Sequence, residues 1–173
     1  MGVTAGLLAL PASAEAMTVR LDIRPGPLGI TAASANQFRP RSGTGDGVTL
    51  TSTVSGFTVT DATGTGAGWH VMMSASAWST DPDGAVVPMP PGSLGMEAPN
   101  VVAEGTSSAP PLVSPGPYGF EPGARPLVIA TAPPEAGMGT YDFSAAPLTL
   151  QAPLGTADRT YGASVSVVVA AGP

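Results

Sequence analysis

Hydrophobic residues in this chain recur at every second position, which is the spacing of a strand buried on one side. The clearest run extends from Trp69 to Trp78. In it, Trp69, Val71, Met73, Ala75 and Ala77 share one face, and His70, Met72, Ser74, Ser76 and Trp78 share the other. A helix needs a period near 3.6 residues, and no convincing amphipathic pattern of that period extends beyond a short stretch. The alternation therefore predicts an all-β fold.

Similar runs recur along the chain and are separated by proline and glycine. Proline has no N–H to donate to a sheet, and glycine adopts the positive φ angles of tight turns, so both types end strands. In the longest run the buried parity changes between Val54 and Phe57, which predicts a bulge or bend near Gly56. The predicted strands are Thr18–Ile23, Gly47–Thr60, Trp69–Trp78, Leu127–Ala132, Pro147–Ala152 and Thr160–Ala171, with shorter ones near Ala85–Met89 and Pro99–Ala103.

The segments between these strands have the composition of turns and loops. Residues 39–47 and 104–126 are predicted as surface loops, the second one long and rich in proline, glycine and serine. Asp61–Gly68 is predicted as a tight glycine turn, and Asp81–Gly84 as a turn in which proline fixes φ. Short strands joined in this way are typical of an antiparallel β-sandwich with long Pro/Gly-rich loops, which is the fold that we predict.

The composition favours a folded chain and excludes some partners. The 23 glycines and 20 prolines among 173 residues would alone indicate low complexity, but 43% of residues are hydrophobic and only 10% are charged, the opposite of a disordered chain. The net charge is -6 and the chain has no lysine, so we expect no nucleic-acid partner. No run reaches the roughly 18 apolar residues of a membrane-spanning helix, so we expect no membrane span.

Residues 1–16 have features of a secretory signal segment. The apolar run Gly2–Leu10 is followed by Pro11 and the small residues Ala12–Ala14, although no positive charge precedes the run. We therefore predict a partial signal segment, a secreted or cell-surface location, and a single domain over residues 17–173. The alternative is an apolar N-terminal strand or a frayed end. The absence of cysteine fits export without disulfides and equally a cytosolic protein.

Catalytic chemistry has few candidate residues. Zinc sites and most nucleophile–base pairs need histidine or cysteine, and the chain has only His70 and no cysteine. The glycines at 64, 66 and 68 precede a strand, so they do not form a phosphate-binding loop at a helix. Asp81 and Asp83 lie in a turn without the apolar shell of a glycosidase acid, and with too few acids nearby for calcium. We predict a non-enzymatic protein with no cofactor and no metal site, in which His70 is structural.

The most specific pattern is the stretch Val59–Trp78, which reads VTDATGTGAGWHVMMSASAW. It resembles the first motif of the WxL cell-wall-binding domain of Gram-positive surface proteins, in which a Val-x-Asp strand leads through a Gly-Thr-Gly turn to a Trp-x-Leu strand. The residues that match are Val59, Asp61, Gly64, Thr65, Gly66, Gly68 and Trp69, with Val71 in place of leucine. The ending Leu148–Pro173 also resembles that family, through Pro153, Tyr161, Val165, Val167 and Pro173, but it lacks the tryptophan of the second Trp-x-Leu.

The resemblance implies a surface protein that attaches noncovalently to peptidoglycan. The candidate ligand-binding residues are Trp69, Trp78, Asp61, Gly66 and Gly68. Tryptophan has a large apolar face and an N–H donor, which suits sugar stacking when exposed and a core position when buried. The alternation puts Trp69 beside Val71 in the core and Trp78 on the other face, so Trp78 is the better candidate for an exposed aromatic. Asp61 is expected to cap the glycine turn by accepting backbone N–H groups.

A second hypothesis is a structural subunit that associates with itself. Exposed strand edges pair readily with other strands, and Thr160–Val169 is a suitable adhesive strand. The partners that we expect are therefore a cell-wall polysaccharide (peptidoglycan), and other surface proteins or copies of the chain itself.

Overall fold

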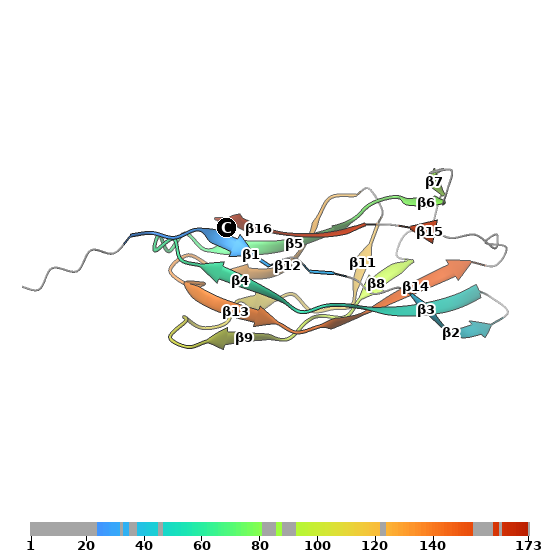
Figure 1. Ribbon diagram of the computed structural model, residues 1–173, viewed down its shortest axis with the longest axis horizontal. Helices are drawn as coiled ribbons and strands as arrows, with labels where there is room; N and C mark the ends of the chain where they lie inside the picture. Colours follow the sequence, from blue (N-terminus) through green and yellow to red (C-terminus); the bar gives the residue numbers. More distant parts are fainter. Residues whose placement is uncertain are drawn as a thin grey trace, which may run out of the picture.

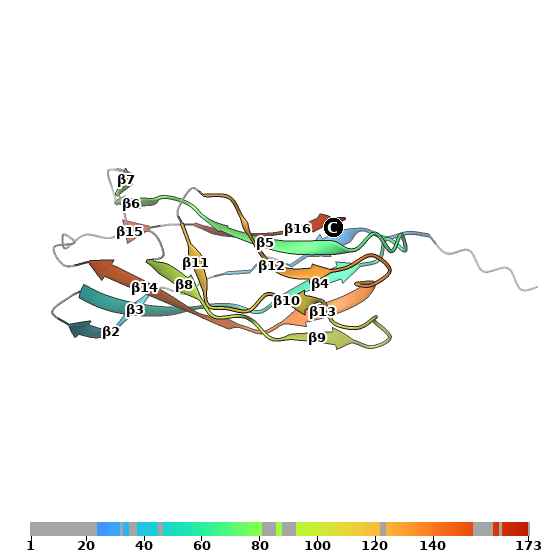
Figure 2. The same cartoon turned by 180° about the vertical axis from the view of Figure 1, so that it is seen from behind.

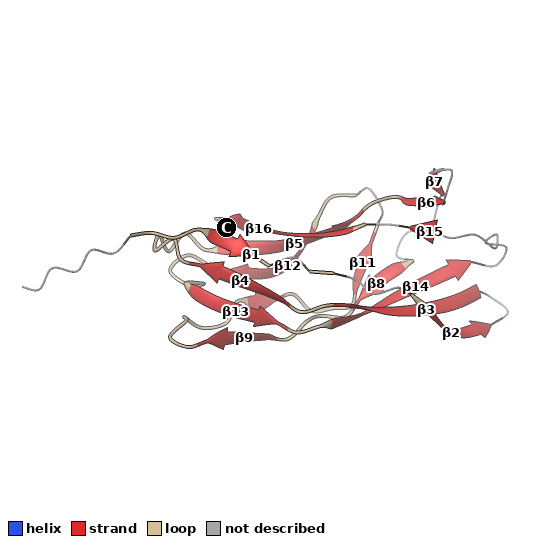
Figure 3. Cartoon of the chain, in the orientation of Figure 1, coloured by secondary structure: helices blue, strands red, loops and turns tan. Residues whose placement is uncertain are grey.

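The protein is an elongated assembly of antiparallel strands in two layers (Figure 1). The computed structural model describes residues 24–31, 33–34, 38–44, 47–80, 86–87, 93–121, 124–153, 161–162 and 164–172. Every regular element in these ranges is a β-strand, and no helix occurs in them (Figure 3). This confirms the predicted all-β, sandwich-like fold. The same ranges contain no helix that could span a membrane.

One layer consists of two sheets that follow one another along the molecule (Figures 1 and 2). The strand order of sheet A is β1 (Leu28–Ile30), β4 (Phe57–Asp61), β13 (Gly139–Phe143), β9 (Val101–Glu104). That of sheet B is β11 (Tyr118–Phe120), β8 (Leu94–Met96), β14 (Ala146–Pro153), β3 (Gly47–Val54), β2 (Arg39–Thr44). Because β3 leads into β4 and β13 leads into β14, these four strands form one long two-stranded ribbon.

The second layer is built on a similar ribbon. The strand order of sheet C is β10 (Leu112–Val113), β12 (Leu127–Ala132), β5 (Trp69–Ala75), β16 (Val165–Ala171). The small sheet D has the order β15 (Tyr161–Gly162), β6 (Trp78–Thr80), β7 (Val86–Val87). Strand β5 leads into β6 and β15 leads into β16, so sheet D continues the ribbon of sheet C.

The hydrophobic core lies between the two layers and follows the predicted alternation. Strand β5 buries every second side chain from Trp69 to Ala75. The predicted strand Trp69–Trp78 was wrong at its end, because the strand breaks after Ala75 and leaves Ala77 exposed. The Trp69 ring contacts Tyr141 of sheet A, with 5.6 Å between ring centroids and 58° between ring planes, and this contact joins the layers. Phe57 and Phe143, opposite each other within sheet A, stack with centroids 4.6 Å apart. Aromatic pairs of this kind contribute about 0.5–1.5 kcal/mol beyond the area that they bury.

The bend predicted near Gly56 is confirmed. Strand β3 ends at Val54 and β4 begins at Phe57, and both side chains are buried, so the intervening residues change which parity faces the core. A Cβ on Gly56 would lie 2.8 Å from the carbonyl oxygen of Phe143, so the close passage of the chains requires glycine. The neighbouring strand breaks at the same level, between Phe143 and Ala146.

A serine closes the gap at three of these strand breaks by the same pair of hydrogen bonds. The backbone N–H of the serine donates to the carbonyl oxygen of a residue in another segment of the chain. The serine hydroxyl accepts the backbone N–H of that same residue. The pairs are Ser55 with Ser34 (2.7 and 2.9 Å), Ser144 with Asn100 (2.8 and 3.0 Å), and Ser76 with Ser164 (2.8 and 2.9 Å). Backbone groups that the breaks remove from the sheet ladder therefore keep hydrogen-bond partners.

Several strand predictions are confirmed. Strand β12 has the predicted bounds Leu127–Ala132, and the predicted strand Pro147–Ala152 lies within β14, where Leu148 and Leu150 are buried. In β16, Val165, Val167 and Val169 are partly buried against the core, as predicted. The predicted signal segment 1–16, the predicted strand Thr18–Ile23 and the predicted turn Asp81–Gly84 lie outside the described residues.

The two predicted loops were wrong in part. Residues 39–47 contain β2, an edge strand whose pairing with β3 is irregular between Pro40 and Ser42, and an edge is where a sheet tolerates proline. Residues 104–126 contain β10 and β11, and β11 buries Tyr118 and Phe120. Strands β1, β8 and β13 were not predicted. Their short runs carry too few alternating residues to show a period.

Candidate functional site

The glycine turn of the WxL-like motif begins at Asp61, at the end of β4. Asp61 is 5% exposed, and its Oδ1 accepts the backbone N–H of Thr63 at 2.9 Å and the Thr63 hydroxyl at 2.7 Å. Hydroxyls continue the turn, because Thr63 Oγ1 accepts the Thr65 N–H at 3.4 Å and Thr65 Oγ1 accepts the Ala67 N–H at 3.3 Å. Asp61 therefore caps the turn, as predicted.

The three glycines of the turn have φ angles of 66°, 63° and 75° at Gly64, Gly66 and Gly68, a region that other residues rarely adopt. The carbonyl of Gly66 accepts the Glu135 N–H at 2.7 Å, and that of Gly68 accepts the Gly172 N–H at 2.9 Å. These two hydrogen bonds hold the loop after β12 and the end of β16 against the turn that precedes β5.

The Trp69 indole completes this connection inside the core. Its exposed fraction is 0%, and Nε1 donates to the carbonyl oxygen of Gly137 at 2.8 Å. A Cβ on Gly137 would lie 2.6 Å from Nε1, so only glycine allows this approach. Four of the predicted ligand-binding residues lie close together in the fold, namely Trp69, Asp61, Gly66 and Gly68. Their polar groups form hydrogen bonds within the protein. Trp78 lies apart from them, in β6 opposite Val87, and its side chain is outside the described residues.

We predict that Gly68→Ala destabilises the protein much more than Gly64→Ala. Both positions have positive φ, which costs alanine about 1–2 kcal/mol. A Cβ at Gly68 would also meet the Ala132 carbonyl oxygen at 2.4 Å, whereas nothing lies within 4 Å of a Cβ at Gly64. We expect this overlap to cost about 1–3 kcal/mol more. Urea unfolding of both variants measures the difference, and equal losses would contradict a structural role for Gly68.

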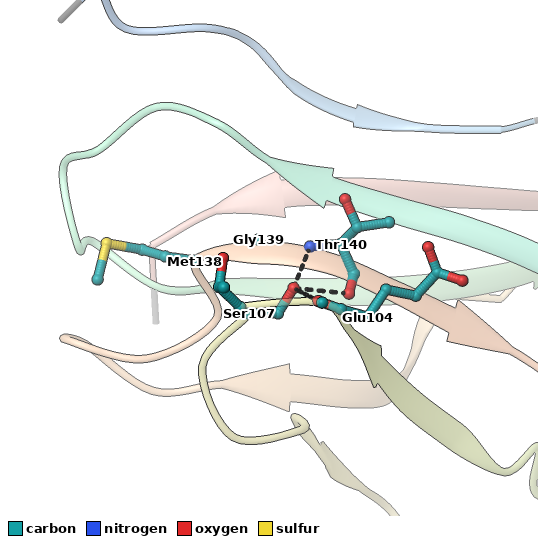
Figure 4. A pocket seen from close by; sticks show the side chains of 7 residues that line it. Glu104, Ser107, Met138, Gly139 and Thr140 are labelled. Atoms are coloured by element: carbon teal, nitrogen blue, oxygen red, sulfur yellow. Dashed lines mark hydrogen bonds between the residues drawn. The ribbon is translucent and has the colours of Figure 1, made fainter.

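A shallow hollow of about 490 Å³ lies where β9 ends and β13 begins (Figure 4). It is lined by Glu104, Gly105, Thr106, Ser107, Met138, Gly139 and Thr140. The Ser107 hydroxyl accepts the Thr140 N–H at 2.8 Å and also contacts the carbonyl oxygens of Glu104 and Thr140. The hydroxyl at the centre of the hollow therefore holds the loop after β9 on β13, and it has little capacity left for a ligand.

Two carboxyl groups interact beside this hollow, on the outer face of sheet A. Glu104 lies opposite Thr140 and Asp142 opposite Val102, so the two acids are diagonal neighbours. The hydrogen bond between them, and then repulsion by Asp142, raises the pKa of Glu104. The Thr58 hydroxyl, which donates to Asp142 Oδ1 at 2.7 Å, lowers the pKa of Asp142, and the bond from Glu104 adds to this. The interaction therefore favours the protonated form of Glu104 and the charged form of Asp142.

This pair does not form a recognisable catalytic or metal site. Both groups stand on an open sheet face, where water screens their interaction. Within the described residues, no three His, Cys, Asp or Glu side chains lie close enough to hold a metal ion. His70, the one histidine, is half-buried on the outer side of β5, opposite Thr131 and Ala170.

We predict that Glu104→Gln leaves stability unchanged at acidic pH and raises it at neutral pH. The raised pKa of Glu104 means that its protonated form stabilises the fold, and this contribution is lost as the pH rises through that pKa. The contribution of Asp142 has the opposite pH dependence, because its lowered pKa means that the charged form stabilises the fold. Glutamine keeps a donor to Asp142 without a charge. Melting temperatures across the pH range test this, with the exposed Glu97→Gln as control, and a pH-independent difference for Glu104→Gln would contradict it.

A third surface, which we call the threonine face, consists of Thr49, Thr51, Thr53, Thr149 and Gln151 on the outer side of sheet B. In the register, Thr51 pairs with Thr149 and Thr49 with Gln151, while the alternate residues Leu148 and Leu150 are buried. Within the described part of the chain, these side chains have no protein hydrogen-bond partner. The alternation of threonine from 49 to 53 was visible in the sequence, but it was not read as a site.

The strands that carry the threonine face are uncharged, but the neighbouring edge strand β2 contains two arginines, and Arg39 lies opposite Thr51. Strands β3, β8, β11 and β14 contain no Asp, Glu, Lys or Arg. Gly95 of β8 lies opposite Thr149, and a Cβ there would approach the Thr149 hydroxyl oxygen to 3.1 Å.

Comparison of the chain with protein-family models, curated proteins and solved structures gives no match.

Proposed function

We propose that this chain is a secreted, non-enzymatic surface domain of the WxL-like type that binds a cell-wall polysaccharide noncovalently. The observation that carries the proposal is the threonine face, a sheet surface on which four hydroxyl groups and one side-chain amide have no hydrogen-bond partner among the described residues. A hydroxyl both donates and accepts hydrogen bonds, so such a row matches a polymer whose own surface is made of hydroxyl groups.

The charge of the chain narrows the class of polymer. With a net charge of -6, the protein as a whole repels anionic wall polymers, and strands β3, β8, β11 and β14 carry no charged group. The positive groups of sheet B are Arg39 and Arg41 of the edge strand β2. A neutral glycan backbone, such as that of peptidoglycan, meets no such penalty. Paired residues such as Thr51 and Thr149 stand about 5 Å apart, so one sugar ring can contact both hydroxyls.

In this proposal the WxL-like motif has a structural role. Asp61, the turn glycines and Trp69 hold sheets A and C together, and the wall contact is made by the other half of the molecule. Trp78, in β6, stays a predicted aromatic contact. Substituting Trp78 by alanine in the assay below tests it separately from the threonine face.

We predict that Thr51→Val and Thr149→Val each weaken the binding of the chain to purified Gram-positive cell walls about fivefold, the equivalent of one lost hydrogen bond. Valine keeps the branched shape and the strand preference of threonine, so the fold is retained. Co-sedimentation with isolated walls measures the bound fraction.

The matched control is Thr60→Val, which removes an exposed hydroxyl from the outer face of sheet A. We expect this variant to pellet with walls like the native chain. The proposal fails if the native protein stays in the supernatant, or if the control variant loses as much binding as Thr51→Val.

A further inference from the structure

We propose that the outer face of sheet C is a self-association surface, through which two copies of this chain pack face to face. This inference does not depend on wall binding, and it concerns a different face of the molecule. Three features of sheet C support it, namely the apolar side chains on its outer face, the absence of charged residues from its strands, and the cover on its edge.

Apolar side chains lie on the outer side of all four strands of sheet C, and three of them form a row across β16, β5 and β12. Val168 of β16, Met72 of β5 and Val128 of β12 lie directly opposite one another in the register. Leu112 of β10 faces the same side but lies in the next row, opposite Thr131, which itself pairs with His70. The exposed fractions are 46% for Val168, 44% for Val128 and 72% for Leu112. We call these four residues the apolar patch. Apolar side chains that gather on one outer face of a sheet are typical of a protein–protein contact.

The strands that carry the apolar patch have no charged residue. Strands β5, β10, β12 and β16 contain no Asp, Glu, Lys or Arg, and His70 is the one ionisable group on them. The outer face of sheet A, in contrast, carries Glu104 and Asp142. Sheets A and C therefore differ, since the outer face of sheet A carries carboxylates and that of sheet C carries apolar side chains.

This distribution favours a second copy as the occupant of the face. Each copy has a net charge of -6, so two copies repel one another wherever their carboxylates approach. Contact through sheet C buries apolar side chains without removing any carboxylate from water, which would be costly. The same surface on each copy then forms a two-fold contact, with the sheets about 10 Å apart as in the interior of a β-sandwich.

Pairing through the edge of sheet C is less accessible than pairing through its face. Strand β16 is an edge strand of sheet C. The hypothesis that Thr160–Val169 pairs with strands of another copy requires such an edge. However, β1 runs alongside β16 (Figure 1), and the Gly172 N–H just beyond β16 is bonded to the Gly68 carbonyl. The outer face has no such cover in the described part of the chain.

Sedimentation of the full chain over a range of concentrations tests the proposal. We expect a reversible dimer whose dissociation constant rises at least about tenfold in Val168→Lys. The matched control is Val102→Lys, because Val102 is 62% exposed on the outer face of sheet A. Lysine lowers the net negative charge in both variants, so a weaker dimer cannot result from added repulsion between copies. Unfolding midpoints confirm that both variants fold.

Salt provides a second measurement. Because the carboxylates of two copies repel, screening by salt tightens a dimer formed through sheet C, whereas a dimer held by ion pairs weakens. The proposal is overturned if the native chain is monomeric at every concentration and salt level, or if Val102→Lys weakens the dimer as much as Val168→Lys. It is also overturned if the native chain is monomeric and Val168→Lys abolishes wall binding, because the face then binds the polymer.

Discussion

Burial of the Trp69 indole is the constraint on which the arrangement of the two layers depends. The N–H of a fully buried ring needs an acceptor, since leaving it unpaired costs about 1–3 kcal/mol. The Gly137 carbonyl provides it at 2.8 Å, and this requires the chain between β12 and β13 to cross the ring at a residue without Cβ. The glycine turn holds the same chain from the other side, through the bond from Glu135 to Gly66.

Because the polar groups of the motif are used inside the fold, both of our proposals place the contacts on the outer faces of the sheets. The side chains that alternate with the core have a different character in each sheet, namely carboxylates on sheet A, threonine hydroxyls on β3 and β14 of sheet B and aliphatic groups on sheet C. In our proposal the WxL-like motif, with its buried tryptophan, stabilises the fold and does not make the wall contact. The same separation allows binding of a polymer and self-association to occur on different sides of one small domain.

The sequence predicted those parts of the fold in which polar and apolar residues alternate over a long run, or in which the interacting residues are close in sequence. The buried face of β5, the bend at Gly56 and the cap at Asp61 are of this kind. Strand β13 was missed because its five residues bury only Tyr141 and Phe143, and its neighbours β4 and β9 are distant in sequence. Strand pairing of this sort depends on tertiary context more than on local preference. The threonine face was missed for a related reason, since only the register with β14 brings Thr149 beside Thr51.

The most direct test of this account is a nuclear magnetic resonance titration of the chain with soluble wall glycan. The account predicts that the amide signals of Thr49, Thr51, Thr53 and Thr149 shift with added glycan, because their side chains face the ligand. It also predicts that the indole N–H of Trp69 does not shift, because it is bonded to Gly137 in the core. Shifts centred on Trp69 and the glycine turn, with none on the threonine face, would contradict it.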